Sequence, residues 1–544
     1  MVEVMGEKFE LEKATTLLEL SRKVKTKFEN EIILAKVNNK LRDLIDTIYP
    51  QNDYRVEFLD ISDPNGFRTY QRSITFVLIY AIKSILGKKT RVLIEHSINK
   101  NYYCEIAGVN VNENLLRQIE NKMYETIKND IPIQKLSLPS ESVNTIMKDF
   151  CEDDNRFKFR RNTNFSLYKL DWYYDYYYGT MLPSTGYIKK FFLHTKLNGF
   201  VVQFPSFDNP YKFEKIKPNE KISQVFLESS HWLKIMNLQT VASLNEKISN
   251  GHINQLIYLS EALHENKIVN IASEICSSKK KIILIGGPTS SGKTTFAHRL
   301  YVQLRVNGLK PYVISIDDYF LNREDSPVDE NGKHDFERLE ALDTDKLNKD
   351  LEMLLAGQEV ELPKFNFVTG HREKSGKFIK LEKNDVLIME GIHGLNEKLT
   401  EKIDRDHKFK IFVSALTQLN IDDHNRISTT DTRLVRRIVR DNQFRGFSAK
   451  NTIGMWKSVT RGENNYIFPY QEEADAFFNS SLVYEMSILK QYATSLLYNI
   501  SEDEEEYCEA NRLIRFLDSF LTLNTKHVPR NSILREFIGG SCFY

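Results

Sequence analysis

The sequence predicts a multidomain protein in which two α+β units and a helical connector precede an α/β domain built on a parallel sheet. Three observations support this order. The chain has 544 residues, 41% of them hydrophobic and 27% charged, which is enough for several independent cores. Short strand and helix patterns alternate through residues 1–205. Further along the chain, three apolar strand patterns end in glycine-rich or acidic turns, where parallel sheets bind their ligands.

Changes in these patterns divide the chain into five expected segments. The first contains an amphipathic helix over Thr16–Phe28 and closes near the strand YRVEFLDI. The second combines a helix over Thr69–Leu86, the strands RVLIEH and YYCEIAG, a polar helix near Glu113–Asn129 and aromatic-rich strands. Leu, Ile and Val recur at helical spacing over Ile222–Ile275, which predicts the connector. The segments are residues 1–64, 65–205, 206–275, 276–485 and a C-terminal helical segment, 486–544.

Charge and cysteine usage exclude several classes of protein. The 75 Lys and Arg residues balance 74 Asp and Glu residues, so no overall field draws the chain to nucleic acid or to an anionic membrane. The five cysteines form no CxxC pair, which argues against a disulfide framework or a zinc ribbon. The most apolar run, Ser73–Leu86, is interrupted by Lys83 before it could span a bilayer. We therefore expect a cytoplasmic protein that neither spans a membrane nor is secreted.

The most specific motif is a phosphate-binding loop. KKIILIGGPTSSGKTT matches GxxxxGK[ST], with an apolar strand before it and a helix pattern after it. In such a loop, backbone N–H groups face the phosphates, Lys293 neutralises phosphate charge and the Thr294 hydroxyl binds Mg²⁺, so we expect ATP and Mg²⁺ as cofactors. A glycine-rich turn with a fortuitous lysine is the alternative. The expected nucleotide-binding residues are Gly287, Pro288, Thr289, Ser290, Ser291, Gly292, Lys293, Thr294 and Thr295.

Two later strands end in acidic residues. YVISIDD ends in Asp317 and Asp318, and DVLIMEGIHG carries Glu390 at the end of its apolar run. Phosphoryl transfer to a hydroxyl needs a carboxylate that accepts the hydroxyl proton, and Asp317 directly follows the apolar strand. Glu390 is placed like an acid that holds Mg²⁺. A solvated turn pair and a simple strand-end acid are the alternatives for the two positions.

Four arginines repeat at helical spacing in DTRLVRRIVRDNQFRG. They occupy positions i, i+3, i+4 and i+7, so they predict one cationic helical face. Like charges on one face repel unless an anion neutralises them, and a transferring phosphoryl group is such an anion. The alternative is a solvated face paired with Asp431 and Asp441. The four residues are Arg433, Arg436, Arg437 and Arg440.

Together these motifs resemble the uridine kinase and phosphoribulokinase family. The resemblance covers about Lys281 to Tyr484 and includes GGPTSSGKTT, SIDDYF, HDFERLEALD, FNFVTGHR, MEGIHG and DTRLVRRIVRD. It implies an ATP-dependent kinase that transfers the γ-phosphate to a hydroxyl, most often of a nucleoside. By the same resemblance Asp317 is the catalytic Asp, Lys293 acts with it, and Thr294, Asp317 and Glu390 adjoin the magnesium ion. The remaining implied positions are the lid residues Arg437, Arg440 and Arg445, with Arg433, Arg436 and Arg445 on the nucleotide side.

The acceptor-binding positions depart from the uridine kinase pattern. Glu337 stands where uridine kinases have a ribose-binding Asp, and Phe365 replaces a base-reading Tyr. The family's base-reading His position holds Gly370, with His371 and Arg372 directly after it. Phe447 stands where these enzymes have an Arg. The resemblance therefore implies Glu337, Phe365, His371 and Arg372 as substrate-binding residues and leaves uridine specificity open.

The first 205 residues are similar to the N-terminal half of threonyl-tRNA synthetase. The similarity rests on IEHSINKNYYCEI and YYYGTMLPSTGYIKKFFL, and it implies a ubiquitin-like TGS module at 1–64 and an editing-type domain at 65–205. In synthetases, four metal-binding or deacylating side chains line the editing cleft. Here the corresponding positions hold Arg72, Phe76, Tyr177 and Met181. The resemblance thus implies a recognition unit without hydrolytic chemistry.

Alternatives to a nucleoside kinase stay open. One is a nucleotide-dependent regulatory protein whose N-terminal half contacts RNA, and another is a kinase of a sugar phosphate or other alcohol. RFKFRRN, at Arg156–Asn162, and the six tyrosines within Tyr168–Tyr178 could form an RNA platform, but a pair of strands with one packed face is favoured. We expect a small-molecule acceptor and no membrane contact, and we leave open whether the protein is a homo-oligomer.

Overall fold

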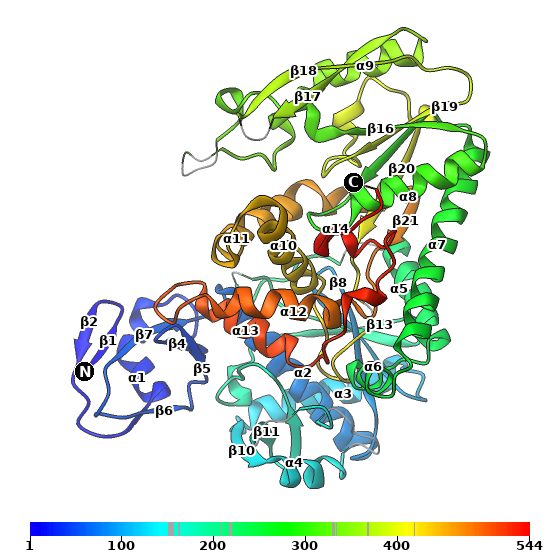
Figure 1. Cartoon of the computed structure of the whole chain (residues 1–544). Coiled ribbons are helices and arrows are strands. Elements are labelled where there is room, and N and C mark those ends of the chain that lie inside the picture. Colours follow the sequence, from blue (N-terminus) through cyan, green and yellow to red (C-terminus); the bar gives the residue numbers. More distant parts are fainter. Residues whose placement is uncertain are drawn as a thin grey trace.

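The fold is described from a computed structural model. It describes residues 1–150, 157–160, 164–207, 209–216, 220–328, 332, 334–366, 369–417 and 419–543. Figure 1 shows the N-terminal strands at one side, the parallel sheet at the other end, and the C-terminal helices between them. No helix within these described ranges is both long enough and apolar enough to cross a membrane.

The first 60 residues form a small mixed sheet with one helix. α1 (Leu17–Val24) starts at a capping box in which Thr16 and Glu19 exchange hydrogen bonds, and a 3₁₀ turn, Lys25–Lys27, completes the predicted helix. The sheet order is β2-β1-β7-β4-β5, with β1 parallel to β7 and β3 paired separately with β6. The strands are β1 (Val2–Val4), β2 (Glu7–Phe9), β3 (Thr15–Thr16), β4 (Leu34–Val37), β5 (Lys40–Arg42), β6 (Thr47–Ile48) and β7 (Tyr54–Leu59).

The next unit is built around one long buried helix. α2 (Pro64–Leu86) begins five residues before the predicted helix, at Pro64, where a missing N–H does no harm. It packs with α3 (Glu113–Lys128) on an antiparallel sheet of order β13-β14-β9-β8, and a second sheet has the order β10-β11-β12. The remaining elements are β8 (Val92–Ile98), β9 (Asn101–Ile106), β10 (Gln134–Pro139), α4 (Ser140–Met147), β11 (Asn164–Leu170), β12 (Tyr173–Tyr176), β13 (Phe192–Lys196) and β14 (Gly199–Gln203).

The segment RFKFRRN differs from the predicted strand in its described part. Residues 157–160 form a turn, in which Phe157 is buried and Arg160 hydrogen-bonds to Ser519 at 2.5 Å. Arg156, Arg161 and Asn162 lie outside the described residues. The tyrosine-rich stretch does lie in a pair of strands, β11 and β12, and they are antiparallel.

Three connector helices follow, as the hydrophobic spacing predicts. They are α5 (Glu220–Ile235), α6 (Val241–Ser249) and α7 (Ile253–Ser278). α7 packs beside α8 and shares a core with the parallel sheet, so it continues past the boundary that we expect after residue 275. The connector is therefore a wall of the α/β unit rather than a free linker.

The α/β unit has a five-stranded sheet of order β16-β19-β15-β20-β21, and all four pairings are parallel. β15 is apolar on both faces: Ile283 faces the core with α7 and α8, and Ile282 faces the core with α9. The strands are β15 (Ile282–Gly286), β16 (Lys310–Ser315), β19 (Asp385–Glu390), β20 (Lys408–Ser414), β21 (Ala476–Asn479) and the antiparallel hairpin of β17 (Val360–Asn366) and β18 (His371–Ile379). The helices are α8 (Lys293–Val306), α9 (Thr344–Leu355), α10 (Thr429–Arg445) and α11 (Ala449–Tyr466).

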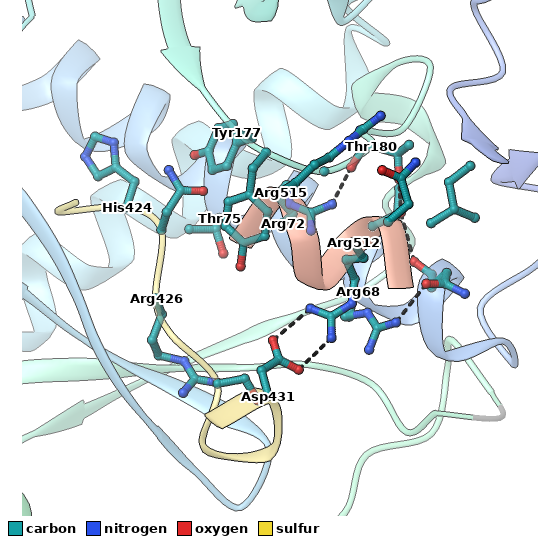
Figure 2. A pocket seen from close by; sticks show the side chains of 18 of the residues that line it. Arg68, Arg72, Thr75, Tyr177, Thr180, His424, Arg426, Asp431, Arg512 and Arg515 are labelled. Atoms are coloured by element: carbon teal, nitrogen blue, oxygen red, sulfur yellow. Dashed lines mark hydrogen bonds and ion pairs between the residues drawn. The ribbon is translucent and has the colours of Figure 1, made fainter. Parts of the chain in front are cut away.

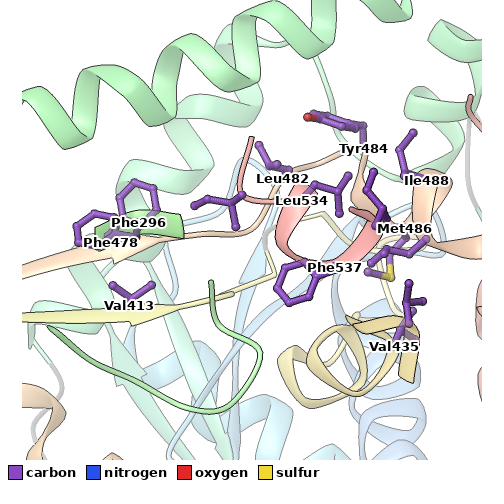
Figure 3. Close-up of a cluster of buried hydrophobic side chains, with 14 of the residues drawn as sticks. Phe296, Val413, Val435, Phe478, Leu482, Tyr484, Met486, Ile488, Leu534 and Phe537 are labelled. Atoms are coloured by element: carbon purple, nitrogen blue, oxygen red, sulfur yellow. The ribbon is translucent and has the colours of Figure 1, made fainter. Parts of the chain in front are cut away.

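The C-terminal helices complete the core of the α/β unit. They are α12 (Glu485–Tyr498), α13 (Tyr507–Leu517) and α14 (Arg535–Ile538). Figure 3 shows Leu534, directly before α14, and Phe537 of α14 beside Val435 of α10 and Met486 of α12. The Arg436 guanidinium lies over the Phe537 ring, 5.0 Å from its centroid. The last helix is therefore an integral part of this core.

This packing predicts that Phe537→Ala destabilises the α/β unit. Phe537 has no exposed surface, so its truncation should leave a cavity and lower the free energy of unfolding by about 3–5 kcal/mol. Chemical denaturation measures the change. Phe378→Ala is the matched control because the Phe378 side chain is 59% exposed. Equal stability of the two variants would contradict the central position of α14.

Candidate active site

The phosphate-binding loop joins β15 to α8 and needs glycine at two close contacts. A Cβ on Gly287 would lie 2.0 Å from the Val413 carbonyl oxygen. Gly292 has φ +86°, and its Cβ would lie 2.6 Å from Ile533 Cγ2 in the C-terminal segment. Both glycines therefore keep the loop curled against β20 and the segment before α14.

The Lys293 and Thr294 side chains occupy the first turn of α8. The Lys293 ammonium donates to the carbonyl oxygens of Gly287 and Pro288, at 3.0 and 3.2 Å, which folds it back over its own loop. The Thr294 hydroxyl donates to Glu390 Oε1 at 3.4 Å. Register explains this contact, because Ile285 of β15 pairs with Glu390 of β19 immediately before the loop begins.

Asp317 and Asp318 face different surroundings. Asp318 Oδ1 accepts a hydrogen bond from the Phe365 backbone N–H at 3.2 Å, so it supports the β17–β18 hairpin. Burial raises the pKa of Asp317, and the nearby Lys293 and Arg445 charges act in the opposite direction. Asp317 is thus the acid of the pair that lies among the cationic groups of the loop and lid.

Two further carboxylates share this environment. Burial raises the pKa of Glu390 to about 7; Lys293 lowers it, whereas Asp317 and Glu536 raise it further. Burial also raises the pKa of Glu337 to about 7, with Glu463 as the next cause and Asp317 among the others. Glu337 packs on Gly462 of α11, where an added Cβ would lie 2.7 Å from the Glu337 Cβ. The site therefore concentrates buried acids around a single lysine.

The other predicted acceptor-binding residues lie on the β17–β18 hairpin. Phe365 is buried, with its ring centroid 5.6 Å from that of Phe320. The Arg372 guanidinium donates to Asp343 Oδ2 at 2.7 Å, and His371 Nδ1 lies 3.6 Å from Glu324 Oε1. The His371 side chain is 53% exposed. The contacts of His371 and Arg372 are thus with acids outside the Asp317 and Glu390 cluster.

Arg433 and Arg436 differ from the predicted cationic face. Both are at most 1% exposed, Arg433 paired with Glu463 of α11 and Arg436 with Glu485 of α12. Arg433 also donates to the Thr289 carbonyl at 3.2 Å, and Arg436 to the Ser290 carbonyl at 3.3 Å. The prediction of one unneutralised face is wrong for these two residues because carboxylates from α11 and α12 neutralise them. Their guanidinium groups therefore support the phosphate-binding loop by hydrogen bonds to its carbonyl oxygens.

The remaining arginines of this region gather around one acid. Arg437, Arg440 and Arg445 each lie within 3.0 to 3.5 Å of a carboxylate oxygen of Asp441, which is fully buried. Three cations share one anion, so positive charge remains in excess. Burial lowers the pKa of Arg445, with Arg440 as the next cause, while the Asp317 charge raises it. This excess charge belongs to the same electrostatic environment as Asp317.

One residue of the site escaped prediction. Glu536 of α14 accepts hydrogen bonds from the Thr295 backbone N–H, at 3.2 Å, and from its hydroxyl, at 3.0 Å. The N-terminus of a helix attracts anions, and here a side chain of the protein supplies one. No local pattern in SILREFIGGS indicates this contact, because Glu536 and Thr295 lie 241 positions apart.

Comparison with known proteins matches the part of the chain that carries this site. The sequence pattern of the Phosphoribulokinase / Uridine kinase family covers residues 282–486. The uridine kinase of Lactobacillus johnsonii is 32% identical over 200 residues, which cover 86% of that protein and 36% of this chain. The chain belongs to the phosphoribulokinase/uridine kinase family. Like other members of this family, it is an ATP-dependent P-loop phosphotransferase.

Further relatives match this family member over a similar share of its length. The uridine kinase of Ligilactobacillus salivarius is 32% identical over 200 residues, or 84% of that protein and 36% of this chain. A solved structure described as a possible uridine kinase from Bacillus stearothermophilus is 18% identical, covers 39% of this chain and 97% of that one, and gives a TM-score of 0.27. Residues 1–281 lie outside the family match.

The position of Glu536 predicts that Glu536→Gln tightens ATP binding. In the free protein the Glu536 carboxylate caps the N-terminus of α8, and when ATP binds it repels the phosphates there. Removing its charge weakens the cap and also removes the repulsion, and both effects favour the nucleotide complex. We expect the dissociation constant for ATP to fall about fivefold, which corresponds to roughly 1 kcal/mol. Calorimetric titration with ATP measures the change. Glu505→Gln, at an exposed acid, serves as the control. Weaker ATP binding in Glu536→Gln would instead identify Glu536 as a ligand-binding group.

Proposed function

We propose that this chain transfers the γ-phosphoryl group of ATP to a hydroxyl group of a nucleoside, with Asp317 as the base. The observation that carries this proposal is the environment of Asp317. It follows β16 at the carboxyl edge of the sheet, where Lys293, Arg445 and Glu390 surround it, whereas Asp318 is engaged by the hairpin. A carboxylate there can accept a proton beside the bound phosphates.

The residues of the loop fit ATP and Mg²⁺. Thr294 and Glu390 offer two oxygen ligands 3.4 Å apart, and such hard donors suit Mg²⁺. The pKa of Glu390, raised to about 7 by burial and neighbouring acids, indicates a place where a cation would stabilise the ionised carboxylate. When bound, Mg²⁺ neutralises phosphate charge and orients the oxygens of the transferring group. Asp317 is the third oxygen donor in reach of this environment.

The chemical step follows from these positions. The acceptor hydroxyl oxygen attacks the γ-phosphorus while the bond to the bridging oxygen of ADP breaks, and the hydroxyl proton passes to the Asp317 carboxylate. The Lys293 ammonium stabilises the negative charge of the phosphates beside the loop. Arg437, Arg440 and Arg445, which share the Asp441 carboxylate, supply positive charge for the transition state.

A nucleoside acceptor is supported by the relatives and by Glu337. Two relatives with 32% identity are named uridine kinases. Glu337 is a buried acid in the same environment as Asp317, and an acid there can accept hydrogen bonds from ribose hydroxyls. His371 is engaged with Glu324 instead, and this difference keeps a sugar phosphate or another alcohol as the alternative acceptor.

For residues 1–205 we infer a recognition unit of the synthetase editing type that has lost its hydrolytic chemistry. Phe76 and Tyr177 meet with ring centroids 5.6 Å apart, and Met181 is buried beside them. Arg72 donates to the Thr180 carbonyl at 2.6 Å. An aromatic ring, a phenol, a thioether and a guanidinium do not form a zinc site. RNA contact by this half remains the second hypothesis.

An acceptor screen tests the proposed kinase activity. The full chain is incubated with Mg-ATP and, separately, with nucleosides, sugar phosphates, simple alcohols and RNA, and products are identified by mass spectrometry. We expect a phosphorylated nucleoside, and we expect Lys293→Ala to lower its formation by about 10³-fold or more, because the variant lacks the phosphate-binding ammonium. ATP turnover that RNA stimulates without a phosphorylated small molecule would refute the proposal.

The assignment of the base gives a second prediction. Asp317→Asn should lower kcat by about 10²-fold or more while Mg-ATP affinity stays within about tenfold, because an amide cannot accept the hydroxyl proton. Asp318→Asn is the matched control, since an amide oxygen still accepts the Phe365 hydrogen bond. Steady-state kinetics with the identified acceptor measure both variants. A larger loss of kcat in Asp318→Asn would reverse the assignment.

A further inference from the structure

A cavity of about 140 Å³ lies where the N-terminal half meets the α/β unit. Most of its walls come from α2, from residues 177–180, from residues 424–431 in the loop before α10 and its first turn, and from α13. In Figure 2 the labelled side chains of these four parts surround one space. None of the phosphate-binding loop or of the acids near Lys293 lines this cavity, so it is separate from the site described above.

The cavity is strongly cationic. Its lining holds one carboxylate, Asp431, and five arginines: Arg68, Arg72, Arg426, Arg512 and Arg515. Asp431 is already engaged, because both of its oxygens accept hydrogen bonds from Arg512, at 2.7 and 2.8 Å. Arg68 and Arg512 also pair with Glu509 of α13, at 3.2 and 2.6 Å, so the unmatched positive charge is that of the other three arginines.

Three of the five arginines have no acidic partner in the described part of the chain. Arg72 donates to the Thr180 carbonyl at 2.6 Å, and Arg426 to the Ile427 carbonyl at 3.1 Å. Arg515 is exposed at the cavity. Arg72 and Arg426 are half-buried, and their hydrogen bonds to carbonyl oxygens leave their charge unneutralised, which favours a phosphate group as the missing partner.

Aromatic side chains provide a second kind of contact. Tyr102, Tyr177 and Tyr178 line the cavity, and the Arg426 guanidinium lies 5.2 Å from the centroid of the Tyr102 ring. Tyrosine rings and guanidinium groups stack face to face with planar aromatic groups. The O–H and N–H groups at their edges can then donate hydrogen bonds to a phosphate. The lining thus combines the two contacts by which proteins bind a base and a phosphate.

We propose that this cavity is a second ligand site, which takes a nucleoside monophosphate and thereby adjusts the kinase site. A small phosphate ester suits a space of about 140 Å³ better than a long chain does, and its charge balances that of the arginines without acidic partners. This proposal assigns the junction between the N-terminal half and the kinase a regulatory role, and it holds whatever the acceptor of the kinase is.

A continuous set of contacts links the cavity to the phosphate-binding loop. Arg512 holds Asp431 in the first turn of α10, and the same helix carries Arg433, which donates to the Thr289 carbonyl at 3.2 Å. The loop before α10 is itself fixed to the N-terminal half, where His424 Nδ1 lies 2.6 Å from Asp175 Oδ2. A phosphate that draws Arg512 or Arg426 inward therefore shifts the start of α10 and, with it, the support of Thr289.

Binding is tested with the full chain while the kinase site is saturated with a non-hydrolysable ATP analogue. The probes are uridine 5′-monophosphate, inorganic phosphate and a short single-stranded RNA, each titrated by calorimetry. We expect one additional site that prefers the monophosphate to inorganic phosphate. Arg426→Gln and Arg515→Gln should each weaken this binding at least tenfold, whereas Arg117→Gln, at an exposed position on α3, should not change it.

Coupling is tested by the reverse titration. Saturation with the monophosphate should change the affinity for the ATP analogue by at least threefold, and Arg515→Gln should abolish this change without altering ATP affinity in the absence of the monophosphate. Arg515 is exposed, so the Arg515→Gln protein should fold normally. Monophosphate binding that survives both arginine substitutions, or tighter binding of the RNA than of the monophosphate, would overturn the proposal.

Discussion

The architecture of the kinase part depends on which groups donate hydrogen bonds to the inward-facing carbonyl oxygens of the phosphate-binding loop. A loop that turns its N–H groups towards phosphates turns some of its carbonyl groups into the protein, where they need donors. Arg433 and Arg436 supply these donors to Thr289 and Ser290. Two buried cations require two buried anions, which α11 and α12 provide as Glu463 and Glu485. The loop thus fixes the positions of three helices that follow it by more than a hundred residues.

A second ionic network joins the two halves of the chain. Burial alone would raise the pKa of Glu509 on α13, but Arg512 and Arg68 hold it at about 2. Arg68 comes from α2 of the N-terminal half, and Arg512 also binds Asp431 of α10. The N-terminal half, the C-terminal helices and the arginine-bearing helix therefore share one set of charges. Such a shared set allows an event in one half to alter the other.

Local patterns predict the parts of this protein that are continuous in sequence. The phosphate-binding loop, three of the five parallel strands and several helices follow from local motifs, and family membership confirms the kinase unit. Local patterns do not reveal ion-pair or hydrogen-bond partners that are distant in sequence. Helical spacing shows that Arg433 and Arg436 share a face, but Glu463 and Glu485 lie 30 and 49 positions away. Glu536 is more distant still, so its contact with Thr295 required the fold itself.

The phosphate-binding loop contacts the C-terminal segment, which the ribosome makes last. The ribosome produces the 241 positions that separate Thr295 from Glu536 in roughly 10–50 s, at usual rates of translation. Throughout that interval the nascent chain has its loop and Lys293, but Gly292 lacks the neighbouring Ile533 and α8 lacks its cap. The phosphate-binding loop therefore acquires the full set of contacts of the finished protein only when α14 has emerged and docked, and prematurely terminated chains lack them.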